Sequence, residues 1–360
     1  MSHYEVRLER DLNRIRKDLA AIATSVQGAL RDAVHALLSG DNRQAYDCIQ
    51  GDLPINRAVR KLDRDCHGFI AIHLPSAGHL RWISSVMRIN IALERIGDYA
   101  VTVCRESVQL PRVPGGILAR EMELMSKESR QMLEQAMQAF ADENAEAAKA
   151  TMVMADQVER EFDTVFEELT DEESQWTKRD IFALLIIFHE LERVSDQAKN
   201  ICEETVFAVT GAGKTPKVYR ILFLDQDNAG TSRLAESLGR KSYPDLMAFT
   251  SAGRAAAPSF DPNMSKLAAE RGLDLGAKTP QTLSPVEGEL SELHVIVSLA
   301  GPVTDYVERV PFHTVALEWE IGAAPDLDAA DAVERWEEIY RDLAVRLRDL
   351  VQLMRGEEVA

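Results

Sequence analysis

The feature that most constrains this chain is an internal repeat in its first half. The segment LERIGDYA at Leu93–Ala100 recurs as LERVSDQA at Leu191–Ala198, at an offset of 98 residues. Repetition of this kind is typical of folds in which each copy forms one supersecondary unit that packs on its neighbour. The repeat therefore predicts two similar units in tandem.

Apolar residues before position 210 recur every three or four residues, which is the spacing of amphipathic helices. The predicted helices cover residues 3–39, 42–72, 76–108, 117–141, 144–169 and 174–209. A Pro- and Gly-rich break at 110–116 divides them into two sets of three, and each copy of the repeat falls in the third helix of its set. The sequence therefore predicts two tandem three-helix bundles, at residues 1–109 and 117–210.

The pattern changes after a second Gly-containing linker at residues 210–216. Residues 218–224 and 293–299 are short, continuous apolar runs, as expected for buried strands of a parallel sheet. Helical stretches alternate with them at 230–241, 262–272 and 327–355. This alternation predicts a small parallel-sheet α/β sandwich over residues 217–360.

Composition and charge exclude several classes of protein. The chain has 360 residues, of which 46% are hydrophobic and 28% charged, as in folded globular proteins. Its longest apolar run, Ile181–Phe188, is far shorter than the roughly 20 residues of a membrane-spanning helix, and its first residues lack the apolar core of a signal peptide. The net charge is −18, and both halves are acidic, so we expect no nucleic-acid partner. We expect a cytoplasmic protein without membrane insertion.

The cysteines of the chain are isolated from one another in sequence. They are Cys48, Cys66, Cys104 and Cys202, and none follows the last of these. Scattered cysteines in a cytoplasmic chain are normally reduced, so we expect neither disulfides nor structural zinc.

Each copy of the repeat carries two acidic residues four positions apart, Glu94 with Asp98 and Glu192 with Asp196. At this spacing the two carboxylates lie on one helical face about one turn apart, where like charges repel. One interpretation is ordinary pairing with basic neighbours on the surface. The other is a divalent or trivalent metal ion, since hard cations prefer carboxylate oxygens. Recurrence in both copies favours the metal, but the residues alone leave both interpretations open.

The two copies, together with DLPIN at Asp52–Asn56 and LRWI at Leu80–Ile83, resemble the PhoU family of phosphate-transport regulators. The resemblance covers residues 5–210 in order, spacing and duplication. It implies two tandem three-helix bundles whose acidic motifs can hold clusters of iron or other metals. It also implies that the protein restrains the phosphate ABC transporter and its two-component sensor when phosphate is plentiful.

The resemblance carries metal-binding roles onto individual positions of this chain. The implied ligands are Glu94, Asp98, Glu192, Asp196 and Asn200, with iron, zinc or nickel as the metal. Two positions depart from the family pattern. Thr102 replaces the family's Asn in the first copy, and His79 replaces the acidic residue that usually precedes Leu-Arg. Both departures weaken the case for a full cluster on the first bundle.

A loop of the phosphate-binding type joins the first predicted strand and helix of the α/β half. Residues 224–236 (LDQDNAGTSRLAE) lie where backbone N–H groups and a helix dipole can bind an anion. With Thr250–Gly253, Arg271–Asp274 and Val295–Gly301, they resemble the low-molecular-weight tyrosine phosphatase and arsenate reductase family. The resemblance covers about residues 218–355 and implies the small α/β fold of that family.

The catalytic residues that this second resemblance implies are absent. The family's loop reads Cys, five residues, Arg, in which the thiolate attacks and the guanidinium binds the oxyanion. Asp225 stands at the cysteine position, Thr231 at the arginine position and Ala300 at the second cysteine of arsenate reductases. We therefore expect a catalytically inactive module, in which Asp225 and Asp227 place negative charge where the anion would bind.

Two other interpretations of this loop stay open. Residues 221–227 begin like the hhhhDxD motif of haloacid-dehalogenase-type phosphatases, with Asp225 as nucleophile and Asp227 as acid and base. Ala229 departs from that motif, which has Thr or Val at this position. The other interpretation is a retained anion or nucleotide site formed by Asn228, Gly230, Thr231 and Ser232.

Together these features predict a non-enzymatic regulator of phosphate uptake and phosphate-dependent signalling. The implied partners are the ATPase subunit of the phosphate ABC transporter, the phosphate sensor histidine kinase and a second copy of this chain in a homodimer. One alternative is a metal- or oxyanion-binding sensor that acts through ligand occupancy of the α/β half. The other is an aspartate-based phosphatase that uses Asp225.

Overall fold

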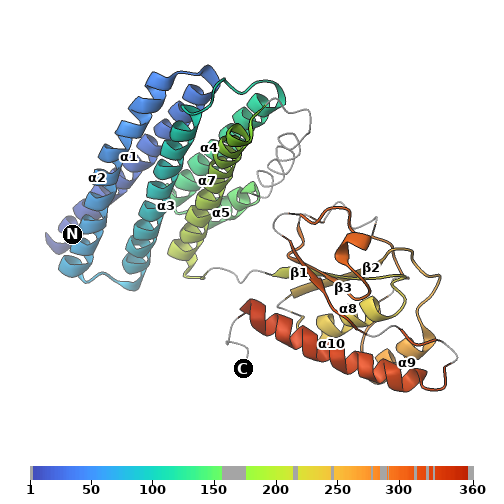
Figure 1. Cartoon of the computed structure of the whole chain (residues 1–360). Helices are drawn as coiled ribbons and strands as arrows, with labels where there is room; N and C mark the ends of the chain where they lie inside the picture. The colour runs from blue at the N-terminus through green and yellow to red at the C-terminus, as the bar shows by residue number, and fades with distance from the viewer. Residues whose placement is uncertain are drawn as a thin grey trace. The chain divides into compact units, whose positions relative to one another are not determined.

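The computed structural model of the chain divides into two compact units, residues 1–215 and 216–360 (Figure 1). It describes residues 3–155, 176–213, 218–244, 247–276, 279–283, 290, 292–311, 314–321, 324–326 and 329–355. The first unit is helical and the second is α/β with a parallel sheet, so the predicted fold class is confirmed. Within the described residues, no helix has both the length and the apolar character needed to cross a membrane.

Long helices on either side of the 110–116 break build the first unit. Its elements are α1 (His3–Ser39), α2 (Asn42–His73), α3 (Ala77–Ser107), α4 (Gly116–Ala141), α5 (Ala145–Met152) and α7 (Lys178–Thr210). The helix predicted over 144–169 begins as α5, but α5 ends at Met152 and a turn follows at residues 153–154, so the prediction of one continuous helix is wrong there. Residues 156–169 lie outside the described residues. The other predicted helices of this unit agree closely with the observed ones.

Local signals set the ends of α7, which carries the second copy of the repeat. Thr177 and Asp180 form a capping box, in which each side chain accepts a hydrogen bond from the other residue's backbone N–H. This satisfies amides at the helix start that lack a partner inside the helix. The helix ends at Gly211, whose φ of 76° lies in the left-handed region that glycine adopts without strain.

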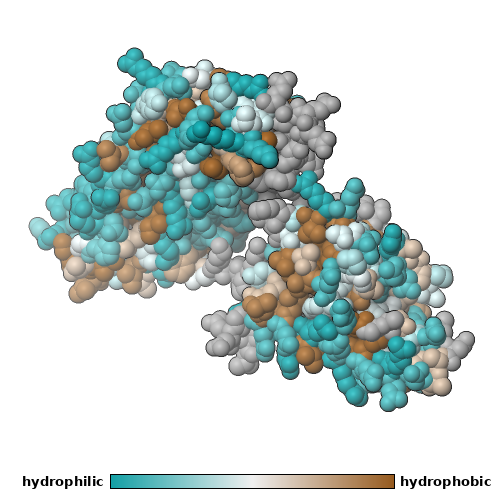
Figure 2. Space-filling model, in the orientation of Figure 1, coloured by the Kyte–Doolittle hydropathy of each residue, from teal (hydrophilic) through white to brown (hydrophobic). Residues whose placement is uncertain are grey.

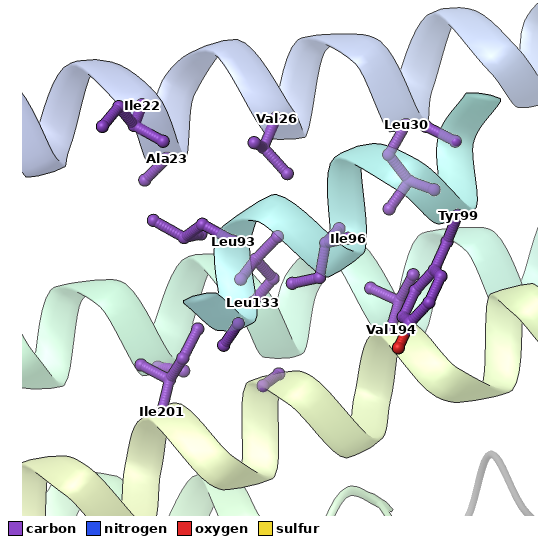
Figure 3. Close-up of a cluster of buried hydrophobic side chains, with 14 of the residues drawn as sticks. Ile22, Ala23, Val26, Leu30, Leu93, Ile96, Tyr99, Leu133, Val194 and Ile201 are labelled. Atoms are coloured by element: carbon purple, nitrogen blue, oxygen red, sulfur yellow. The ribbon is translucent and has the colours of Figure 1, made fainter. Parts of the chain in front are cut away.

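The apolar faces of both predicted bundles merge into one core. Figure 3 shows its centre, where side chains from α1, α3, α4 and α7 point toward one another. The labelled residues are Ile22, Ala23, Val26, Leu30, Leu93, Ile96, Tyr99, Leu133, Val194 and Ile201. Because α3 and α7 pack against each other, the two copies of the repeated segment lie side by side at the centre of the unit. In the view of Figure 2 this unit presents mostly hydrophilic residues, as amphipathic helices with buried apolar faces should.

The second unit is built on a four-stranded parallel sheet in the order β2-β1-β3-β4. Its elements are β1 (Tyr219–Asp225), α8 (Thr231–Ser242), β2 (Met247–Gly253), α9 (Pro262–Glu270), β3 (Val295–Ser298), the 3₁₀ turn η2 (Val303–Asp305), β4 (Val315–Glu318) and α10 (Ala332–Arg355). Ile221 and Phe223 of β1 pack in the core that α8, α9 and α10 cover. Leu222 and Leu224 alternate with them and join a smaller core on the opposite face.

The apolar runs in the sequence predict β1 and β3 but not β2 or β4. The physical reason is position, because β1 and β3 are the central strands and are buried on both faces, whereas β2 and β4 lie at the edges. Residues of β2 alternate between buried and exposed in its first half, and β4 is largely exposed. Edge strands therefore lack the continuous apolar run that identifies a central strand.

The order of the strands determines where a ligand site would lie in this unit. The chain leaves β1 toward β2 on one side, while β3 pairs with β1 on the other side. In open α/β sheets, ligands bind at the carboxyl ends of the strands where the order reverses in this way. The loop at 225–231, which joins β1 to α8, lies at this point.

Candidate functional site

The first candidate site is a group of polar side chains on α2 and α3, which we call the acidic face: Asp52, Asn56, Glu94 and Asp98. Burial raises the pKa of the Asp98 carboxyl from its ordinary value, and the charges of Asp52 and Glu94 raise it further. The Asp52 side chain lies over Gly97, where an added Cβ would be 3.7 Å from Asp52 Oδ1. The structure thus brings Glu94 and Asp98 together with a third carboxylate from a neighbouring helix.

Two oxygens of the acidic face are buried without a hydrogen-bond donor. Asn56 Nδ2 donates to Asp52 Oδ2 at 2.6 Å. In the part of the chain that the structure describes, Asp52 Oδ1 and Asn56 Oδ1 have no such partner. A buried acceptor without a donor costs about 1–3 kcal/mol. Carboxylate and amide oxygens are ligands of the type that hard cations prefer.

The second acidic pair, on α7, has different surroundings. Glu192 is buried, and its Oε2 lies 3.2 Å from His189 Nδ1, whereas Asp196 one turn later is exposed. Glu190, two residues before Glu192, is half-buried, and its Oε2 lies 4.0 Å from Arg193 Nη1. Burial raises the pKa of its carboxyl, and the charge of Asp98 raises it further. The two predicted pairs are therefore not equivalent.

Asn200 lies in a hollow between α3 and α7. The hollow has a volume of about 300 Å³, and its lining includes Arg88, Arg95 and Glu204. Arg88 Nε is 2.6 Å from Glu204 Oε1, and Asn200 Nδ2 donates to Gln197 Oε1 at 3.5 Å. Asn200 therefore lies beside guanidinium groups as well as near the acidic residues that precede it on α7.

No preformed metal centre appears among the described residues, in the sense that no three His, Cys, Asp or Glu side chains there are arranged to hold an ion. Residues 156–175, which belong to the second bundle by sequence, lie outside this statement. The metal roles of Glu94, Asp98, Glu192, Asp196 and Asn200 stay predictions.

The second candidate site is the loop after β1, where Asp225 is buried and already bonded to the chain. Its Oδ1 accepts from the backbone N–H of Asn228 at 2.7 Å, and its Oδ2 accepts from that of Ser232 at 2.8 Å. Asp227 Oδ1 accepts from the N–H of Ala229 at 3.0 Å. Burial raises the pKa of Asp225, while the bonds from Ser232 and Asn228 oppose that shift. The loop's own carboxylates thus accept the hydrogen bonds of amides that an external anion would need.

The side chain of Asn228 connects this loop to the interior of the α/β unit through hydrogen bonds. Its φ of 54° is left-handed, which Asn tolerates better than most residues. Its Nδ2 donates to Ser232 Oγ at 2.9 Å and to Ser251 Oγ at 2.8 Å, and its Oδ1 accepts from the N–H of Gln281 at 3.0 Å. Asn228 and Ser232 are both fully buried. These polar groups are therefore engaged inside the unit.

A buried ion pair extends the same network. Ser251 Oγ donates to Glu236 Oε2 at 2.6 Å, and Arg233 Nη1 donates to the same oxygen at 2.7 Å. Arg233 is fully buried, and its Nε also donates to the carbonyl of Leu275 at 3.1 Å. Buried ion pairs persist when hydrogen bonds satisfy the remaining donors, as they do here. The network fixes the start of α8 against β2.

Neighbouring residues pack closely around the loop and leave little free space beside it. A Cβ on Gly230 would lie 2.7 Å from Trp336 Cη2 of α10, and one on Gly253 would lie 2.6 Å from the backbone N of Asn228. Thr231, at the first position of α8, is buried. The residues predicted to bind an anion therefore line a packed loop, and their role stays a prediction.

Tyr306 is a residue of this region that sequence reasoning missed. Its hydroxyl accepts from Gln226 Nε2 at 3.0 Å and donates to the carbonyl of Ala300 at 2.5 Å. Burial raises the pKa of Tyr306, and the charge of Asp225 raises it further. A tyrosine after a 3₁₀ turn gives no signal in sequence, since the turn brings it to the loop only in the fold.

The described helices define a class of protein: a helical unit in which the two copies of a repeated segment lie on the neighbouring helices α3 and α7, and each copy carries an acidic pair. The PhoU domain family matches residues 19–107 and 122–205, one match in each bundle. The chain belongs to the PhoU family.

Relatives and solved structures agree with this assignment. The chain is 31% identical over 215 residues to the phosphate-specific transport system accessory protein PhoU homolog of Pseudomonas aeruginosa, covering 58% of this chain and 88% of the relative. It is 26% identical over 211 residues to PhoU of Escherichia coli, covering 58% and 88%. The crystal structure of Pseudomonas aeruginosa PhoU matches with a TM-score of 0.54 at 31% identity, over 57% of this chain and 99% of that one.

The α/β unit also has similar solved structures. An arsenate reductase from Archaeoglobus fulgidus is 24% identical, with a TM-score of 0.30, over 36% of this chain and 98% of that one. The fold of this unit is established by its own strand order and register.

Proposed function

We propose that this protein is a cytoplasmic accessory regulator of a phosphate-specific transport system, in which the helical unit contacts the partners and the α/β unit performs no catalysis. The observation that carries the proposal is the match of both bundles to the PhoU domain. Similar proteins in Pseudomonas aeruginosa and Escherichia coli are named accessory proteins of such systems. The partners we expect are the ATPase subunit of the phosphate transporter and the phosphate sensor histidine kinase.

Co-purification tests this role directly. The tagged full-length chain is isolated from phosphate-replete cells, and bound proteins are identified by mass spectrometry. We expect the transporter ATPase or the sensor kinase, and deletion of the gene should raise phosphate uptake under the same conditions. If neither partner is recovered and uptake is unchanged, the regulator role is wrong.

A charge variant tests whether the acidic face contributes to binding of the transporter ATPase or the sensor kinase. Asp98→Ala removes a carboxylate from the acidic face, and we expect it to reduce recovery of the partner. Glu146→Ala on α5 removes an equally negative but highly exposed group, and it is the matched control. Equal recovery with both variants would exclude the acidic face from the contact.

The loop after β1 supports the proposed inactivity of the α/β unit. A thiol-based mechanism needs a cysteine, and no cysteine occurs after Cys202. An Asp225 nucleophile would need an oxygen exposed to the substrate, but Asp225 is buried and both of its oxygens accept backbone hydrogen bonds. Assays of phosphate-ester hydrolysis and arsenate reduction should show no activity. Hydrolysis that disappears in Asp225→Asn would instead support the aspartate-based phosphatase.

A second part of the proposal is that the acidic face binds a divalent or trivalent metal ion, with iron, zinc and nickel as candidates. The residues that would hold it are Asp52, Asn56, Glu94 and Asp98. A bound cation would supply the positive charge that these clustered oxygens lack. Burial raises the pKa of Asp98, and the further rise caused by the charges of Asp52 and Glu94 supports this proposal.

Elemental analysis of protein purified without chelator tests the metal proposal. We expect bound metal in the wild type and less in Asp52→Ala and Asp98→Ala. Glu192→Ala with Asp196→Ala tests the second pair separately. Equal trace content in the wild type and all variants would contradict metal binding.

A further inference from the structure

A groove runs between α1 and α4 of the helical unit, and none of the residues of the acidic face lines it. Its volume is about 270 Å³, and its lining comes from α1, from Trp82 of α3 and from α4. Between Arg16 and Gln27 the groove follows α1 for about three turns, or roughly 16 Å. Because α1 precedes the 110–116 break and α4 follows it, the groove joins the two halves of the unit.

The floor of this groove is aromatic and apolar. The rings of Trp82 and Phe140 are stacked, with their centroids 5.8 Å apart and their planes inclined by 17°. Leu19 and Ala23 of α1 are buried and line the same groove, and Ala20 is an exposed small residue of its lining. A flat apolar group would gain contact area here, because it could lie against the rings and the small side chains.

Arg16 contributes a positive charge to the lining, but this charge is already paired. Its guanidinium carbon lies 4.9 Å from the centre of the Trp82 ring. Its Nη1 is 3.5 Å from Glu9 Oε1, and its Nη2 is 3.3 Å from Glu143 Oε1. Two carboxylates thus surround one guanidinium, so this part of the groove does not favour an anion.

Glu134 of α4 adds a free negative charge to the lining. It is exposed, and within the described residues its carboxylate has no ion-pair partner. Gln138, one turn further along α4, donates to Asp142 Oδ2 at 2.8 Å. One guanidinium and four carboxylates therefore line the groove or bond to its lining. This balance of charge favours a cationic ligand.

We propose that the groove binds a small aromatic amine, whose ring rests on Trp82 and Phe140 and whose ammonium group pairs with Glu134. The size of the groove agrees with such a ligand. Its volume of about 270 Å³ is close to the lower end of the roughly 300–1,000 Å³ typical of small-molecule sites, which suits a ligand of one or two fused rings. This inference stands independently of the proposed phosphate role.

Calorimetric titration of the full-length protein with three probes tests the chemistry of the ligand. Tryptamine carries a ring and an ammonium group, indole-3-acetate carries the same ring with a negative charge, and spermidine carries ammonium groups without a ring. We expect tryptamine to bind at least about tenfold more tightly than either of the others. Equal binding of indole-3-acetate, tighter binding of spermidine, or no binding of tryptamine at millimolar concentration would overturn the proposal.

Methyl NMR of the methionine side chains tests the location of the ligand. Met137 lines the groove, whereas Met264 is buried in the core of the α/β unit. Tryptamine should shift the methyl signal of Met137, because a bound ring lies near it, and should leave that of Met264 unchanged. A shift at Met264 without one at Met137 would place the ligand elsewhere and contradict the proposal.

Variants separate the charge of the groove from its shape. Glu134→Gln removes the free carboxylate and should weaken tryptamine binding about fivefold, as expected for an exposed ion pair. Ala20→Leu should abolish binding by filling the groove, and the exposure of Ala20 means that the fold should tolerate it. Glu123→Gln, at an exposed position of the same helix, is the matched control and should bind as the wild type does. Wild-type affinity in both Glu134→Gln and Ala20→Leu would show that tryptamine does not bind in this groove.

Discussion

Asp98 on the helical unit and Asp225 on the α/β unit both have pKa values that burial raises, but their neighbours are of opposite kinds. The neighbours of Asp98 are further carboxylates, Asp52 and Glu94. The neighbours of Asp225 are backbone amides that donate to both of its oxygens. The difference shows that an aspartate beside a predicted ion site has two quite different roles. On the acidic face its charge adds to that of other carboxylates, and in the loop its oxygens occupy amides that an anion would otherwise bind.

The largest effect on stability is expected from removing the Asp225 carboxylate from the loop after β1. Asp225→Ala leaves the buried amides of Asn228 and Ser232 without acceptors, which should lower the free energy of unfolding of the α/β unit by roughly 2–5 kcal/mol. Phosphate or sulfate should recover part of this loss by bonding the same amides. Thermal unfolding with increasing phosphate measures both effects.

Asp227→Ala is the control for this substitution, since Asp227 is exposed and accepts a single amide bond. We expect a much smaller loss of stability and no response to phosphate. A wild-type protein that is stabilised by phosphate as strongly as Asp225→Ala would show that the loop amides are not occupied by Asp225.

An intermediate effect is expected on the acidic face. Asn56→Ala removes both a proposed ligand and the hydrogen bond that orients Asp52, so metal affinity should fall by at least the roughly 10–100-fold typical of losing a supporting bond. Calorimetric titration with zinc or nickel ions measures the change. Asn13→Ala on α1, where an exposed Asn13 amide donates to Glu9, is the matched control and should leave the affinity unchanged.

The smallest effect concerns pH. Because the folded state raises the pKa of Asp98, ionisation of this carboxyl costs stability as pH rises through and above its ordinary value of 3.8. Asp98→Asn should therefore be more stable than the wild type at neutral pH, by a few tenths of a kcal/mol for so exposed a group. The two proteins should become equal in acid, below the ordinary pKa.

Denaturant unfolding at neutral and acidic pH measures this difference. Asp47→Asn removes an exposed charge elsewhere on α2 and is the control. An Asp98→Asn protein that is less stable than the wild type at neutral pH would contradict the repulsion on the acidic face.

Much of the fold could be predicted from sequence, since apolar periodicity directly reports which helical face is buried. The bounds of α1 agree with the predicted 3–39, and α2 and α3 agree nearly as well. The central strands were equally clear from their continuous apolar runs. The edge strands β2 and β4 were missed because their burial depends on neighbours that only the assembled sheet supplies.

The sites were harder to predict for a related reason. Glu94 and Asp98 are four residues apart on one helix, so their proximity is local and visible in sequence. Asp52 and Asn56 show the same spacing, but their approach to Asp98 depends on the packing of α2 against α3. The bonds of Asp225 depend on the left-handed backbone of Asn228, which no residue pattern reveals.

The shared core of the helical unit has a consequence for how its two repeats can change. Leu93 and Ile96 from the first half of the unit lie in one buried core with Val194 and Ile201 from the second half (Figure 3). A chain divided at the 110–116 break would expose these faces to water, at a cost of about 1.5–3 kcal/mol for each large side chain. The duplication is therefore no longer separable into its halves. A substitution in the buried face of one repeat must also suit the side chains of the other repeat in the shared core. The two repeats can therefore differ in sequence only in ways that keep this core packed.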